Sequence, residues 1–166
     1  MEFDTHTDLL KVAAKSVVKP NFEIGNTPHK FLNHHFNFPN RVEWKPIEVK
    51  LVDHIGKGGG GQDSVTSVLY NQFLRAAGYR FPTDEKQCQL AVTKDKASRE
   101  ALQGVTLKQL SGDGPKAAVE SCVVEEWTLR NPWVSMINFG DLAYEDDGLV
   151  ELTLTITYDW AEYKAP

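Results

Sequence analysis

The sequence has few of the features that mark secreted disulfide scaffolds or membrane proteins. It holds two cysteines, Cys88 and Cys122, among 166 residues. That is too few for a disulfide framework and is typical of free thiols in a reducing compartment, although one bridge between the two stays open. No stretch of about 18 or more apolar residues occurs, so we expect no membrane span. The N-terminus lacks a basic start followed by an apolar run, which argues against a signal peptide.

Positive charge is also in short supply. Lys and Arg total 18 against 23 Asp and Glu, for a formal net charge of -5. Proteins that grip nucleic acid through its phosphates are usually basic, so this balance argues against that role. It is compatible with a surface past which nucleic acid slides. The length and the hydrophobic fraction of 41% fit one globular domain over residues 1–166.

A glycine-rich stretch, GKGGGGQD at 56–63, invites a phosphate-binding interpretation. It follows an expected strand and precedes an expected helix. A phosphate loop needs Lys and then Ser or Thr directly after its last glycine. Here Lys57 precedes the glycines, and Asp63 at the helix entry would repel a phosphate. We therefore expect a flexible loop at 56–62, with nucleotide or anion binding through Lys57 as the alternative.

Other reactive side chains lack the spacing that catalysis or metal binding needs. His29, His34 and His35 have no accompanying Cys pair, and adjacent residues of an extended strand point to opposite sides. The serines lack a G-x-S-x-G context. Cys122 lies among apolar residues and is expected to be a small buried side chain. We expect no catalytic residue, no metal site, no cofactor and no enzyme activity.

Alternating patterns typical of β-strands are abundant. Ile47, Val49 and Leu51 alternate with polar residues and predict a strand, as do 105–110 and 118–129. Two adjacent apolar residues at 123–124 indicate a kink in the last of these. The clearest alternation runs from 149 to 163 and predicts one long strand. Its polar face comprises Glu151, Thr153, Thr155, Thr157 and Asp159.

Helical spacing is clearest after the glycine-rich stretch. Asp63 or Ser64 would cap a helix of about 14 residues that ends at Gly78. Residues 1–40, with three prolines, are expected to be a loop-rich segment containing at most one short strand. The fold class is therefore mainly β and antiparallel, with a helix packed at one side. Long strands with unpaired edges need a cover or a partner, which indicates assembly.

The C-terminal part of the chain resembles a known family. The segment VVEEWTLRNPWVSMINFGDLAYEDDGLVELTLTITYDWAEY at 123–163 is similar to the C-terminal region of tail tube proteins from contractile-tailed bacteriophages. The shared elements are a strand ending at Trp127, NPWV at 131–134, the FGDLAYEDDGLVEL corner at 139–152 and a final alternating strand closing on YDWAEY. WKPIEVKLVD at 44–53 is similar to the middle of the family, and residues 3–24 to the segment leading into it.

The resemblance implies two packed antiparallel sheets forming a small barrel with one flanking helix, a fold shared with the tube protein of type VI secretion. It implies homohexameric rings stacked into a hollow tube of the virion tail, assembled in the host cytoplasm. Sheath, tape-measure and baseplate proteins would be its partners, and DNA would pass through the lumen without specific binding. The family usually has a further strand before the position of Met1, so a shortened tube-forming surface is also an expectation.

Under this resemblance, the five polar-face residues at 151–159 are candidates to face an acidic lumen. Trp44, Trp127 and Trp133 are candidates for the core or for contacts between subunits. Two other interpretations stay open. A tube-initiator or tube-cap protein of the baseplate or neck would form a single ring with the same fold. A monomeric β-sandwich binding module would not assemble at any concentration.

Overall fold

The computed structural model describes residues 2–3, 13–53, 55–58, 61–71, 77–79, 92–102, 104–111, 123–141 and 149–165. These residues are mainly β, and every pairing between their strands is antiparallel. The strands are β1 (Glu2–Phe3), β2 (Ala14–Val17), β3 (Asn21–Phe31), β4 (His34–Lys45), β5 (Ile47–Val52), β6 (Ile55–Gly58), β7 (Gly61–Ser64), β8 (Val105–Leu110), β9 (Val123–Arg130), β10 (Trp133–Asn138), β11 (Glu151–Thr157) and β12 (Trp160–Lys164). The helical elements are α2 (Val65–Leu69) and the π-helical η2 (Lys96–Leu102).

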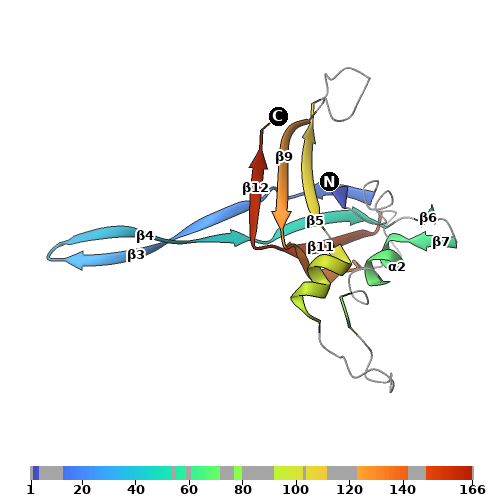
Figure 1. The fold of residues 1–166 in the computed structure, drawn as a ribbon, viewed down its shortest axis with the longest axis horizontal. Helices are drawn as coiled ribbons and strands as arrows, with labels where there is room; N and C mark the ends of the chain where they lie inside the picture. The colour runs from blue at the N-terminus through green and yellow to red at the C-terminus, as the bar shows by residue number, and fades with distance from the viewer. Residues whose placement is uncertain are drawn as a thin grey trace.

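Two four-stranded sheets pack around one core (Figure 1). Sheet I has the order β1-β8-β9-β12, and sheet II has the order β10-β11-β5-β2. Sheet II contributes fully buried side chains from both β5 and β11: Ile47, Val49, Leu51, Leu152, Leu154 and Ile156. Burying one such side chain stabilises the fold by about 1.5–3 kcal/mol. The alternation predicted for these two strands is therefore confirmed.

Sheet I closes the core from the other side. Val105 of β8 and Leu129 of β9 lie opposite each other and are buried. The kink expected at 123–124 is confirmed, because the register between β8 and β9 shifts there and Val123 pairs with Leu110. Within the described residues, no helix combines the length and the hydropathy needed to cross a bilayer.

The prediction of a single strand over 149–163 is wrong. The chain bends at Tyr158 and Asp159, so that β11 pairs with β10 and β5 in sheet II while β12 pairs with β9 in sheet I. The Asp159 amide donates to the Arg130 carbonyl at 3.0 Å and fixes the bend. Alternation continues through the corner because Tyr158 stays buried. The period of the pattern therefore gave no sign of a change of sheet.

The prediction of a loop-rich segment over 1–40 is wrong for residues 21–40, while residues 1 and 4–12 lie outside the described ranges. Strands β3 and β4 form a ribbon that is paired from Asn21↔Lys45 out to Phe31↔His34. With 11 residues in β3, the ribbon spans about 35 Å at the usual rise of a strand. In Figure 1 it projects far beyond the two sheets. Pro28 and Pro39 are tolerated because each strand of a two-stranded ribbon has an edge with no neighbour to bond.

The helix after the glycine-rich stretch begins where expected. The Ser64 hydroxyl accepts the Ser67 amide at 3.1 Å and caps α2, which buries Val65 and Leu69. Gly78 has a φ of 103°, as suits the expected stop, but residues 72–76 lie outside the described ranges and the length of the helix is untested. In place of the loop expected at 56–62, β6 and β7 form a short ribbon, with 59 and 60 outside the described residues.

Candidate assembly surface

Four of the five predicted lumen residues share one face of sheet II, on the side away from the core. Thr153 lies opposite Lys50, and Thr155 lies opposite Glu48. We call this face the polar wall. Its residues are Lys15 and Ser16 of β2, Glu48 and Lys50 of β5, Trp133, Met136 and Asn138 of β10, and Glu151, Thr153, Thr155 and Thr157 of β11. The prediction that these β11 residues form one polar face is confirmed.

The charges of the polar wall cancel. Lys15 pairs with Glu151 across strands that are far apart in sequence. The hydrogen bond from Lys15 and its positive charge hold the pKa of Glu151 below its ordinary value. Lys50 and Glu48 add one further charge of each sign. The wall is therefore polar with balanced charge, which departs from the acidic face that the sequence led us to expect.

Asp159 is placed apart from the other four. It lies in the corner between β11 and β12, where Lys94 Nζ donates to its carboxylate at 2.6 and 2.8 Å. Asn131 Nδ2 donates to the same carboxylate at 2.9 Å. These hydrogen bonds, that from Lys94 first, lower the pKa of Asp159. Its carboxylate thus fastens the corner of the chain to two other segments.

The three predicted tryptophans all pack against the core and stay partly exposed. The Trp44 ring lies 5.2 Å from the Phe22 ring and 6.0 Å from the Tyr158 ring. The Trp127 ring lies 5.0 Å from that of Tyr163. Trp133 borders the core at the start of β10. Their packing supports the core alternative, and a contact between subunits stays a prediction.

The β3–β4 hairpin carries the surface that sequence reasoning missed. Seven apolar side chains on it are each at least half exposed: Phe22, Ile24, Phe31, Leu32, Phe36, Phe38 and Val42. Monomeric proteins rarely expose a large contiguous apolar patch, and such patches mark interfaces. The signal in the sequence was short: Phe-Glu-Ile at 22–24 and Phe-Asn-Phe at 36–38 alternate as strands do. Pro28 and Pro39 lie close to these short alternations, and because prolines are typical of loops the sequence predicted a loop-rich segment instead.

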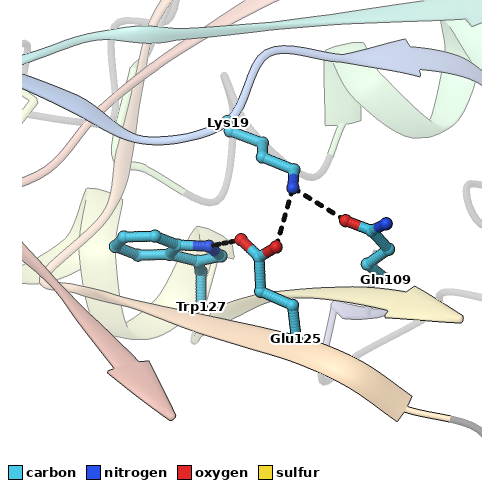
Figure 2. A network of polar contacts seen from close by, with 4 residues as sticks. All are labelled: Lys19, Gln109, Glu125 and Trp127. Atoms are coloured by element: carbon cyan, nitrogen blue, oxygen red, sulfur yellow. Dashed lines mark hydrogen bonds and ion pairs between the residues drawn. The ribbon is translucent and has the colours of Figure 1, made fainter. Parts of the chain in front are cut away.

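A polar network fastens the root of the hairpin to sheet I (Figure 2). Lys19, two residues before β3, donates to Gln109 Oε1 at 2.7 Å and to Glu125 Oε2 at 2.8 Å. Trp127 Nε1 donates to the other oxygen of the Glu125 carboxylate. The hydrogen bond from Lys19, and then that from Trp127, lower the pKa of Glu125. The network joins the segment between β2 and β3 to strands β8 and β9.

The described ranges hold no group of three or more His, Cys, Asp or Glu residues placed to bind a metal ion. The pairing of β3 with β4 places the clustered histidines on two different faces of the ribbon. His34 lies opposite Phe31 and His29 opposite Phe36 on one face, while His35 lies opposite Lys30 on the other. What the described surface offers is a polar wall and an apolar hairpin, both of which suit contact with macromolecules.

Comparison with known proteins adds structural relatives. No protein-family model and no curated protein matches the sequence. Three solved structures each match this chain with 92% of its length covered. A chain in the baseplate of the anti-feeding prophage is 13% identical, with 81% of that chain covered and a TM-score of 0.58. One in the PVC sheath-tube complex, an extracellular contractile injection system, is 11% identical, with 81% covered and a TM-score of 0.59. One in the tube terminating cap of the anti-feeding prophage is 10% identical, with 80% covered and a TM-score of 0.59.

The fold is tail-tube-like. The predicted fold class, two packed antiparallel sheets with a helix at the side, is confirmed. So is the resemblance seen in residues 123–163, which supply β9, β10, β11 and β12 of this tail-tube-like fold. At 10–13% identity the likeness concerns the fold. Function must be argued from the surfaces of this chain.

Proposed function

We propose that this chain is a structural subunit of a contractile-tail tube, without enzyme activity. Its copies assemble into hexameric rings that stack into a hollow conduit. The observation that carries the proposal is the hairpin, which holds seven apolar side chains at least half exposed on an extension beyond the two sheets. A lone two-stranded ribbon is marginally stable in water, so such a hairpin gains stability when another surface covers it.

The energy available from the hairpin suits cooperative assembly. Burying the exposed half of one large apolar side chain contributes roughly 1 kcal/mol, so seven contribute roughly 7 kcal/mol. Association costs about 4–15 kcal/mol in lost freedom of motion. A single hairpin contact is therefore weak, and stable particles need several contacts closed at once. A ring or a stack of rings provides that closure.

The polar wall is the surface that we assign to the lumen. Glu151, Thr153, Thr155 and Thr157 line it, and its ion pair between Lys15 and Glu151 is already satisfied within the chain. A polar wall whose charges balance lets a cargo slide without specific binding. DNA is the proposed cargo. Sheath, tape-measure and baseplate proteins are the proposed partners in the virion tail, assembled in the host cytoplasm.

The structural relatives support this role. They come from a baseplate, a sheath-tube complex and a tube cap, and the baseplate structure is six-fold symmetrised. The test is negative-stain electron microscopy of the purified chain over a concentration series, with light scattering on the same samples. Rings or hollow rods are expected above a threshold concentration. A strict monomer at the highest concentration would refute the proposal and favour a binding module.

A second candidate has support of its own. Two of the relatives belong to a baseplate and to a terminating cap. An initiator or cap subunit would form one ring and stop. Rods that lengthen with concentration would identify the tube subunit, while single rings of constant size would identify the initiator or cap.

A further inference from the structure

The outer half of the β3–β4 hairpin is amphipathic. Residues directly opposite each other in an antiparallel pair share a face. The pairs Phe31↔His34, His29↔Phe36 and Thr27↔Phe38 therefore share one face of the ribbon. The His29 and Phe38 rings meet on it at 6.5 Å. The opposite face of this half carries Lys30↔His35, Pro28↔Asn37 and Asn26↔Pro39.

The inner half is amphipathic on the opposite face of the ribbon. Successive residues of a strand alternate between faces, so Phe22 and Ile24 of β3 lie on the other side from His29 and Phe31. Ile24 pairs with Val42, and Phe22 with Trp44. The remaining face of this half is charged, since Lys45 pairs with Glu23 at 2.7 Å and Glu23 lies opposite Glu43.

A β-bulge separates the two halves. The register shifts between Ile24 and Asn26, where Gly25 faces both Asn40 and Arg41. A Cβ atom on Gly25 would lie 3.4 Å from the Asn40 Cβ and 3.6 Å from the Arg41 carbonyl oxygen, so both residues of the bulge lie in contact distance of this position. Bulges increase the local twist of a strand pair. Figure 1 shows β3 and β4 crossing between the root and the tip, so the ribbon turns over along its length.

The apolar side chains of the outer half lie on the opposite face of the ribbon from those of the inner half. We propose that the twist of the ribbon compensates for this change of face. The apolar side chains of both halves then form one continuous side of the hairpin, and a second copy of this chain lies along that whole side. This inference rests on the proposed function. It goes further by assigning one partner to both halves, whereas two separate apolar faces would take two partners.

The distribution of charge along the chain supports a second copy as the partner that covers the apolar side of the hairpin. Residues 24–42 contain Lys30 and Arg41 and no Asp or Glu, a formal charge of +2. The whole hairpin, Asn21–Lys45, also holds Lys45, Glu23 and Glu43, for a formal charge of +1. The chain as a whole has a net charge of -5, which leaves -6 for everything outside the hairpin. A cationic extension is thus complementary to the body of another copy. A contact of hairpin on body joins two different surfaces, and such contacts repeat into rings or stacks.

The first test is site-specific photo-crosslinking within assembled particles. A photoreactive residue replaces Phe38 or Val42, one on the apolar side of each half, or replaces Asn37 or Glu43 on the opposite side as matched controls. Mass spectrometry of the joined peptides identifies what each position contacts. Phe38 and Val42 are expected to join adjoining stretches of one neighbouring copy, with the two controls at least about tenfold less efficient.

Two crosslinking results would overturn the inference while leaving self-assembly intact. One is crosslinks from Phe38 and Val42 to separate copies, seen as trimers in mixed particles in which only a few copies carry the probe, each of them at both positions. The other is equal efficiency at Asn37 and Glu43. Particles absent from the unmodified chain would instead overturn the proposed function, and this inference with it.

The second test addresses the charge of the hairpin. The double variant Lys30→Glu, Arg41→Glu is expected to raise the concentration at which particles form by at least about tenfold. It turns the formal charge of residues 24–42 from +2 to -2. Lys30 lies on the same face as Asn37, so the effect is the replacement of long-range attraction to the acidic body by long-range repulsion. The matched control, Lys30→Arg with Arg41→Lys, keeps the charge and is expected to assemble as the unmodified chain does. An unchanged threshold in the charge-reversed variant would refute the body of a second copy as the occupant.

Discussion

Replacing Phe36 and Phe38 by Ser should weaken assembly and leave the fold of the subunit intact. The two side chains are 50% and 56% exposed in the isolated chain. Burying the exposed half of each against a neighbour contributes roughly 1 kcal/mol, or roughly 2 kcal/mol for the pair. That loss corresponds to an increase of about 30-fold in the dissociation constant of each contact. The threshold for particle formation should rise accordingly.

The assay measures two quantities on the same samples. Light scattering over a dilution series gives the assembly threshold, and thermal unfolding below that threshold gives the stability of the single subunit. Asn37→Ser, on the opposite face of the ribbon, is the matched control and should change neither. The reasoning is refuted if the double variant assembles normally. It is equally refuted if its thermal midpoint falls as far as that of a variant with a hole in the core.

Three other perturbations test the fold and the corner. Leu154→Ala should lower the free energy of unfolding by about 2–5 kcal/mol in urea denaturation, because Leu154 is fully buried in sheet II. Thr153→Ala on the polar wall should stay within about 0.5 kcal/mol, and equal losses would contradict the assignment of the two faces. The pKa of Asp159 is lowered in the folded chain by Lys94, so its contribution to stability is present above the pKa of the unfolded state and disappears as the pH falls through the folded pKa. As the pH is lowered from neutral, the thermal midpoint of Asp159→Asn should therefore fall less steeply than that of the unmodified chain. If the two plots of midpoint against pH run parallel, the pairing of Asp159 with Lys94 contributes nothing to stability. Ser64→Ala removes the cap of α2 and should cost about 0.5–2 kcal/mol by chemical denaturation, whereas Ser64→Asp keeps an acceptor and should retain stability.

Local patterns predicted the parts of the fold whose burial is decided within the chain. The alternation of β5 and β11 reports which side chains meet the core, and the adjacent valines at 123–124 report a bulge in β9. Ser64 begins a helix because its hydroxyl satisfies an amide that the helix leaves free. Each of these signals depends on a few neighbouring residues. That is why each can be read from sequence.

The hairpin could not be read in the same way. Its apolar residues change face at Gly25, so no single alternation runs along it, and its prolines are tolerated only because the ribbon has free edges. The sequence also does not predict that the positive and negative charges of the polar wall cancel. Lys15 reaches Glu151 from a strand 136 residues away, and only the strand order of sheet II brings them together. Asp159 does not share the predicted polar face, because the chain bends at the corner and its carboxylate pairs with Lys94.

The corner at Tyr158 and Asp159 has a mechanical consequence. Strands β11 and β12 form one continuous length of chain that belongs to sheet II before the corner and to sheet I after it. The two sheets cannot slide past each other here without displacing a buried tyrosine and breaking the Asp159 contacts to Lys94 and Asn131. Under an axial load the body should therefore move as a stiff block. If copies join through their hairpins as proposed, compliance in a chain of such blocks would be confined to those hairpins.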